Sequence, residues 1–160
     1  GYSHFLARFV GGRVAITAVA EGPRSPYVEE LVPGFDDGAH ATALGKALLA
    51  TLNPEQRSRY LKEWGMRAFT PATLTSPEAF DADLIAGERR GMQVEVGQFR
   101  IGLACAAVPV TNDRDMERRV VLACAMPAAE LLVNGRLVRA KLLSTARGLA
   151  EIFAADTASA

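Results

Sequence analysis

The spacing of apolar residues changes twice along this chain, and these changes constrain the fold more than any single motif does. Residues 4–10 and 13–21 are apolar, β-branched stretches joined by Gly11-Gly12. They predict a β-hairpin, because glycine readily adopts the positive φ angles of tight turns. Helical spacing begins near Thr42, and strand-like spacing returns after Gly91.

The predicted order of elements, β-β-β-α-α-α-β-β-β-α, places the chain in the α+β class. Hairpin-linked strands with helices gathered between them favour an antiparallel sheet of about six strands covered by helices, and not a doubly wound parallel sheet. Strands are expected at 4–10, 13–21, 27–32, 92–96, 102–110 and 119–126. Helices are expected at about 42–52, 54–64, 77–90 behind a capping serine, and 134–153, followed by a frayed tail at 156–160.

Length and charge limit the class of protein. The chain has 160 residues, of which 49% are hydrophobic, and this predicts one domain with a sizeable core. Eighteen Lys and Arg balance eighteen Asp and Glu, so this segment alone is not expected to bind nucleic acid or an anionic membrane. No apolar run approaches the roughly 20 residues that cross a bilayer, and no secretory signal is visible. We therefore expect a cytoplasmic protein, cut out of something longer because its first residues run directly into a strand.

Two groups of residues raise the alternative of metal binding or catalysis. Asp36-Asp37 and His40 offer oxygen and nitrogen ligands, but a solvated loop is favoured because the chain has one other histidine, and no metal is expected. Cys105 would be a nucleophile if a cation or a base stabilised its thiolate, whereas its apolar neighbours favour a buried, inert thiol. The spacing of Cys105 and Cys124 favours free thiols without excluding a disulfide.

The start of the first predicted helix has two interpretations of equal weight. Small residues over 41–46 leave backbone N–H groups and the positive end of the helix dipole open to a ligand carboxylate. In the structural interpretation, Thr42 merely caps the helix and Gly45 packs on the sheet. Glu95 lies on a predicted strand and points to the opposite face from its neighbours Val94 and Val96. If the Glu95 carboxylate faces the core, it needs a hydrogen-bond partner or a proton. More often, such a carboxylate faces water.

The chain also contains three longer stretches in a distinctive order: Gly38–Ala50, Arg89–Met92 and Gly102–Val110. Together with the threonine-rich segment at 70–75, they resemble the C-terminal domain of IclR-type bacterial transcription regulators over nearly the whole chain. The resemblance implies a GAF-like, or profilin-like, antiparallel sheet and an effector pocket between the sheet and a cap. It further implies a homodimer or homotetramer that reaches DNA only through an N-terminal winged helix-turn-helix domain absent from this chain.

The resemblance also implies which residues bound the effector pocket. They are Ala43, Leu44 and Gly45 at the helix start, Glu95, Leu103, Cys105, Ala123 and Ala125 on the strands, and Tyr27 and Leu31 on the cap side. Some relatives that bind small acids have serines where this chain has Ala123 and Ala125, so two hydroxyl donors are missing. A floor of Ala, Cys and Leu favours a partly apolar ligand such as an aromatic or branched organic acid, with a small keto acid as the alternative. Glu95 would select a ligand hydroxyl or amine.

The expected function is therefore ligand sensing without a cofactor, and not catalysis. A small molecule that binds one arrangement of the cap more tightly would shift the spacing of the tethered DNA-binding domains. Two rival hypotheses make different predictions. An enzyme using Cys105 with His40 or a carboxylate requires a reactive thiol in an open cleft, and a ligand-free oligomerisation module requires a closed core where a cavity is expected.

Overall fold

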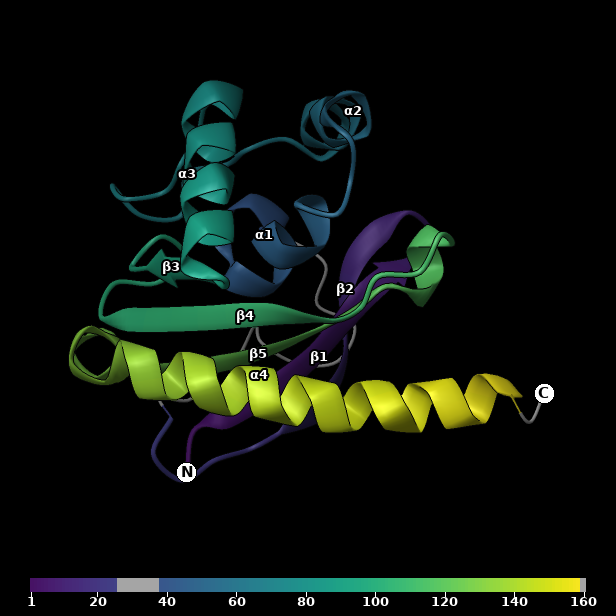
Figure 1. Cartoon of the computed structure of the whole chain (residues 1–160). Helices are drawn as coiled ribbons and strands as arrows, with labels where there is room; N and C mark the ends of the chain where they lie inside the picture. Colours follow the sequence, from purple (N-terminus) through teal and green to yellow (C-terminus); the bar gives the residue numbers. More distant parts are fainter. Residues whose placement is uncertain (26–37, 159–160) are drawn as a thin grey trace.

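One antiparallel sheet divides the molecule into two layers of helices (Figure 1). A computed structural model describes residues 1–25 and 38–158 of the chain. Its strands are β1 Ser3–Val10, β2 Arg13–Ala20, β3 Gln93–Val96, β4 Leu103–Thr111 and β5 Val120–Pro127. They lie in the order β2-β1-β5-β4-β3, and every neighbouring pair is antiparallel. The predicted α+β class is thus confirmed.

The predicted hairpin is confirmed in its turn chemistry as well as its position. Gly11 and Gly12 have φ angles of 56° and 79°, in the left-handed region that residues with a Cβ rarely occupy. One of the six predicted strands, at 27–32, lies outside the described residues.

The helices are α1 Ala43–Leu49, α2 Pro54–Trp64, α3 Pro77–Arg90 and α4 Ala128–Ala158, with short 3-10 turns η1 Ala39–Ala41 and η2 Met116–Arg118. The predicted N-terminal ends of α2 and α3 are confirmed. Asn53 forms a reciprocal capping box with Gln56, and the Ser76 side chain accepts from the Ala79 N–H. α3 ends where Gly91 takes a left-handed conformation.

Two of the predicted helices have wrong boundaries. The first helix ends at Leu49 and not at 52, because residues 50–52 form a turn that leads to the next cap. The last helix begins at Ala128, six residues before the predicted start at 134, and continues to Ala158 into the predicted frayed tail. Leu131, Val138 and Leu142 of α4 pack on the sheet, and this packing carries the helix through Asn134-Gly135. Within the described residues, no helix is both long and apolar enough to cross a bilayer.

Each face of the sheet has its own core. α1 packs against β1, β3, β4 and β5 on one face, where alternate residues such as Phe5, Cys105 and Ala123 are buried. α4 covers β4 and β5 on the opposite face, over Ala106, Leu122 and their neighbours. Figure 1 shows α1, α2 and α3 on one side of the sheet and α4 along the other. Strand alternation therefore decides which strand side chains face α1.

Close backbone packing at Gly45 gives a test of this arrangement. A Cβ built on Gly45 would clash with the Ala39 carbonyl oxygen, whereas one built on Gly135 of α4 would meet nothing within 4 Å. We expect Gly45→Ala to lower the free energy of unfolding by about 1–3 kcal/mol through overpacking. Gly135→Ala should raise it by up to about 1 kcal/mol, because alanine favours the helix. Urea unfolding measures both, and equal effects would contradict the tight packing of α1 on η1.

Candidate functional site

The strand residues predicted to bound a pocket lie together on the face beneath α1. Glu95 pairs with Cys105 across β3 and β4, and Cys105 pairs with Ala125 across β4 and β5. Because directly paired residues in an antiparallel sheet point to the same side, these three side chains form one row across the sheet. Leu103 and Ala123 belong to the same buried cluster, as do Ala43 and Leu44 of α1.

The floor of this region is made of small side chains. The central strand β5 and its neighbour β4 carry the floor residues, which are Cys105, Ala107, Ala123 and Ala125. Small residues at paired positions keep the sheet surface low beneath the α1 layer. The floor offers no hydroxyl group, since its one heteroatom is the sulfur of Cys105.

Tyr27 and Leu31, predicted to close the pocket, lie outside the described residues. The chain on either side of them is anchored around the same region. The Ser25 hydroxyl donates to the Ala125 carbonyl at 2.7 Å, at the end of the β1–β5 ladder. Gly38, with φ of 77°, begins η1 where a Cβ would meet the Phe69 ring at 2.8 Å. The segment that carries Tyr27 and Leu31 joins these two anchored ends.

The α1 terminus combines the two interpretations of its sequence. The Thr42 hydroxyl accepts from the Gly45 N–H at 3.3 Å, so Thr42 does cap the helix and the Gly45 amide is not vacant. Gly45 approaches the backbone of Ala39 in η1 and not the sheet, which corrects the structural interpretation. The amides of Ala43 and Leu44 remain as first-turn donors that a helix does not pair internally.

Glu95 is buried and does not face water as the commoner case predicts. Its side chain is 1% exposed, and Oε2 accepts from the backbone N–H groups of Gln98 at 2.9 Å and Phe99 at 3.4 Å. Within the described part of the chain, Oε1 has no hydrogen-bond partner of ordinary geometry, although the Cys105 thiol lies beside it. Burial raises the pKa of Glu95 to about 7, while the two backbone donors, the thiol and the charge of Lys46 act in the opposite direction.

A buried lysine, missed as a site residue by the sequence analysis, lies next to this carboxyl. Lys46 of α1 is 0% exposed, and its Nζ donates to Asp83 Oδ2 at 2.6 Å, Gln98 Oε1 at 2.6 Å and the Val94 carbonyl at 3.2 Å. These bonds join α1 to α3 and to the β3 region. Burial lowers the pKa of Lys46, and the bond to Asp83 opposes this shift. The sequence signal for a buried lysine was its position as the one charged residue within the apolar run Ala43–Ala50.

The two cysteines lie on opposite faces of the sheet. Cys105 belongs to the cluster under α1, and Cys124, one residue out of phase with it across the ladder, belongs to the cluster under α4. Both are free, so the disulfide that spacing left open does not form. Burial raises the pKa of the Cys105 thiol well above its usual value, and the Glu95 carboxyl adds to this effect. The surroundings of Cys105 therefore oppose a reactive thiolate.

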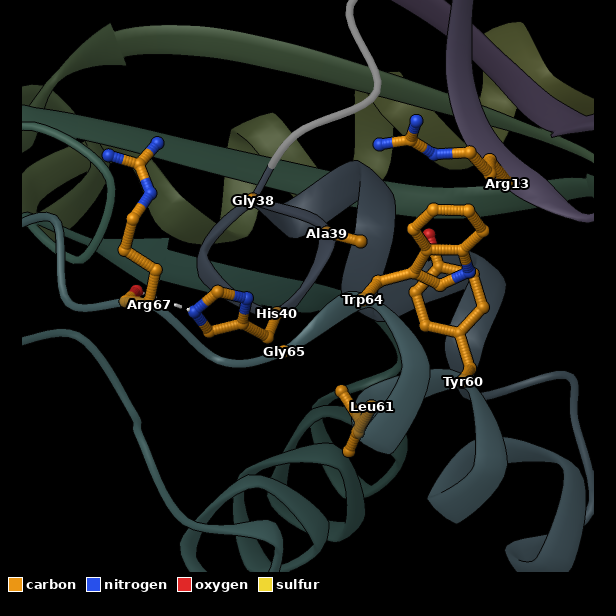
Figure 2. A pocket seen from close by; sticks show the side chains of 9 residues that line it. All are labelled: Arg13, Gly38, Ala39, His40, Tyr60, Leu61, Trp64, Gly65 and Arg67. Atoms are coloured by element: carbon orange, nitrogen blue, oxygen red, sulfur yellow. Dashed lines mark hydrogen bonds between the residues drawn. The ribbon is translucent and has the colours of Figure 1, made fainter.

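A small cavity beside η1 is too small for an organic effector. It has a volume of about 30 Å³ and lies between β2, η1 and α2 (Figure 2). The His40 ring bonds the Arg67 carbonyl through Nε2 at 2.8 Å, and the Arg13 guanidinium lies 4.1 Å from the centre of the Trp64 ring. A cavity of this size holds about one water molecule.

The exposure of His40 corrects the interpretation of that residue. Its ring is buried, so the solvated loop favoured for this residue is wrong at His40, while Asp36 and Asp37 lie outside the described residues. Among the described residues, no three metal-ligating side chains gather in one place.

Comparison with known proteins assigns this arrangement to a family of regulators. The family model described as "Bacterial transcriptional regulator IclR C-terminal" matches residues 31–152. The HTH-type transcriptional regulator BhcR of Paracoccus denitrificans is 37% identical over 78 residues, covering 49% of this chain and 28% of that protein. The p-hydroxybenzoate hydroxylase transcriptional activator of Acinetobacter baylyi is 34% identical over 88 residues, 55% of this chain and 32% of that protein. The chain spans about a third or less of the length of these two relatives.

Solved structures share the fold. The C-terminal domain of the Escherichia coli transcriptional regulator KdgR has a TM-score of 0.78 at 22% identity and covers 94% of this chain and 86% of that one. The inducer-binding domain of a PobR double mutant from Acinetobacter, in complex with 3-hydroxybenzoic acid, has a TM-score of 0.74 at 23% identity. That match covers 93% of this chain and 87% of the PobR chain.

The raised pKa of Glu95 makes stability depend on pH in a defined direction. Its ordinary pKa is 4.5, and in the folded protein it is about 7, so between these values the folded state binds the extra proton. Stability from this group is present below pH 4.5 and is lost as pH rises towards 7, by roughly 3 kcal/mol in total. Glu95→Gln keeps the shape and cannot ionise, so its stability relative to wild type should rise over this range.

Urea unfolding at several pH values measures that difference. Glu88→Gln, which changes an exposed carboxylate on α3, is the matched control and should leave the pH profile of the wild type unchanged. Parallel profiles for wild type and Glu95→Gln would show that Glu95 ionises as freely in the folded chain as in the unfolded one.

Thiol labelling tests the alternative of a cysteine-dependent enzyme. Because both thiols are buried and burial raises both pKa values, we expect Cys105 and Cys124 to react slowly in the native protein and rapidly in urea. Mass spectrometry after timed labelling assigns each site. Rapid native labelling of Cys105 that increases across neutral pH would revive the enzyme hypothesis.

Proposed function

The chain belongs to the IclR family of bacterial transcriptional regulators, and from that premise we propose that it is the effector-sensing domain of such a regulator. In this proposal a small, partly apolar organic acid binds between α1 and the sheet. The pocket is bounded by Ala43, Leu44, Gly45, Glu95, Leu103, Cys105, Ala123 and Ala125, with Tyr27 and Leu31 on the cap side. Binding is coupled to DNA by an N-terminal winged helix-turn-helix domain outside these residues.

The observation that carries the proposal is Glu95 Oε1, a buried carboxyl oxygen that, among the described residues, has no hydrogen-bond donor of ordinary geometry and only the Cys105 thiol nearby. Folded proteins leave few buried polar atoms without a partner, and an exception calls for a ligand, a water or a function. Within the described residues, Glu95 Oε1 is such an atom, and it lies on the same row of the sheet as the small floor residues Cys105 and Ala125. A bound molecule with a polar group above this row would satisfy it.

The class of ligand follows from the groups that surround the floor. Alanine and cysteine side chains suit an aromatic ring or a branched aliphatic body. Because burial raises the pKa of Glu95 to about 7, a protonated Oε1 is available near neutral pH to donate to a ligand oxygen. The first-turn amides of Ala43 and Leu44 offer further donors to a carboxylate, though a seven-residue helix adds only a modest dipole. The hydroxybenzoate bound to the PobR domain is of this chemical class.

Coupling to DNA requires that bound and free states differ in their affinity for the effector. The segment between Ser25 and Gly38 joins two anchored points and contains the proposed cap residues, so an effector under the cap would favour one of its arrangements. A shift in that equilibrium would alter the spacing of tethered DNA-binding domains.

A homodimer or homotetramer is part of the same proposal, since a symmetric regulator suits a symmetric operator. Exposed apolar side chains near the start of α4 support it: Ile101, Leu132 and Val133 are 77%, 78% and 82% exposed. Ile101 is close to that helix end, because the neighbouring Gly102 carbonyl accepts from the Ala128 N–H. Light scattering on the purified chain gives the subunit count.

A thermal-shift screen tests the effector site. The probes are 3-hydroxybenzoate, 4-hydroxybenzoate and a branched 2-keto acid, and a binder at a hundred times its Kd stabilises the fold by about 2.7 kcal/mol. Ala123→Phe fills the floor and should abolish this stabilisation. Ala123→Ser keeps the volume and adds a hydroxyl donor, so it should favour the more polar acids.

Two controls separate site effects from damage. Ala18→Phe places the same ring on an exposed position of β2 and should leave ligand stabilisation intact. Circular dichroism reports whether Ala123→Phe still folds, and Ala123→Ser carries the test if it does not. Full stabilisation in folded Ala123→Phe would place the ligand elsewhere, and no stabilisation by any acid would favour a ligand-free oligomerisation module.

A further inference from the structure

The opposite face of the sheet contains a cavity that the proposed effector site does not use. α4 packs over β4 and β5, and the same face of β1 is partly covered, with Tyr2 and Leu6 packing at the edge of this cluster. Figure 1 shows the N-terminus on the same side of the molecule as α4, and Tyr2 bonds Glu130 of that helix. A pocket of about 280 Å³ lies there between β1 and α4, near the lower end of the roughly 300–1,000 Å³ typical of small-molecule sites.

Apolar groups form the inner surface of this pocket. Cys124 of β5 and Val138 and Leu142 of α4 line it and are buried, and Leu137 adds a half-exposed apolar side chain. Burial raises the pKa of the Cys124 thiol to about 12, so the thiol adds no charge. The inner surface suits an aromatic or branched apolar body.

One wall of this pocket is polar, and hydrogen bonds within the protein fix the positions of its side chains. The Tyr2 hydroxyl donates to Glu130 Oε2 at 2.8 Å, and the Asn134 amide donates to the same oxygen at 3.0 Å. His4 bonds the Tyr2 carbonyl through Nδ1 at 2.8 Å. Two neutral donors thus engage Glu130, the one carboxylate among the described residues that line the pocket, and this reduces its repulsion of an anion.

The rim carries two cations. Arg24 lies with its guanidinium carbon 4.7 Å from the centre of the Tyr2 ring, and Lys141 lies on α4 one turn beyond Leu137. Neither forms an ion pair within the described part of the chain. Two positive groups against one hydrogen-bonded carboxylate leave a net positive rim over an apolar base.

We propose that this pocket is a second ligand site, which takes a small aromatic monocarboxylate. The ring lies against Cys124, Val138 and Leu142, and the carboxylate reaches Arg24 and Lys141 at the rim. The site lies on the opposite face of the sheet from the proposed effector pocket and does not depend on it. A ligand here contacts Tyr2 and therefore the segment by which the chain enters β1.

An NMR titration of backbone amides with benzoate tests the site. Saturable shifts are expected at His4, Asn134 and Lys141, and they should persist in Ala123→Phe, which blocks the other face. The double variant Arg24→Ala with Lys141→Ala removes two exposed side chains without disturbing the core, and it should weaken binding about tenfold. Benzyl alcohol, which lacks the charge, should bind more weakly than benzoate.

Arg147→Ala is the matched control, because it removes an exposed cation of α4 that does not line the pocket. It should leave benzoate binding unchanged. The proposal is overturned if benzoate gives no saturable shift, if the shifts centre on Ala43 and Glu95 and vanish in Ala123→Phe, or if Arg147→Ala weakens binding as much as the double variant.

Discussion

The antiparallel pairing of β4 with both β3 and β5 is the constraint on which the rest of the structure depends. It fixes the side to which each side chain of three strands points, so that Glu95, Cys105 and Ala125 share one row while Ala106 and Cys124 face the other way. A slip of one residue would exchange the two faces and place the carboxyl of Glu95 against α4. Both proposed binding regions are consequences of this single register.

Buried charge distinguishes the α1 face from an ordinary core. Lys46 and Glu95 are both fully buried, yet they are satisfied differently: Lys46 has three acceptors, while among the described residues Glu95 has backbone donors on Oε2 and the Cys105 thiol beside its carboxyl. Burying polar groups costs stability unless partners replace water, so the unequal treatment points to a role for the Glu95 carboxyl beyond the fold. Lys46 holds α1 against α3 and β3, and it thereby keeps the α1 layer in place above that carboxyl.

The other face shows how one long helix creates space. α4 continues from Ala128 to Ala158 and packs along β4 and β5, while Leu6 of β1 packs at the edge of the same cluster. The difference between a straight helix and a twisted sheet leaves a hollow where they diverge. In this chain cations lie at the rim of the hollow and apolar groups at its base.

The sequence by itself determined the elements whose signals are local. Gly11-Gly12, the Asn53 capping box and the Ser76 cap each act within a few residues, so the hairpin and the starts of α2 and α3 were predictable. The five strand residues of the predicted site came from the resemblance to IclR-type regulators, and the strand register places their side chains on one face. Only the tertiary structure decided the rest: that α4 begins at Ala128, that His40 and Glu95 are buried, that Lys46 reaches Asp83, and that the two cysteines point apart. Each of these depends on contacts between segments distant in sequence, and no local propensity records which faces meet.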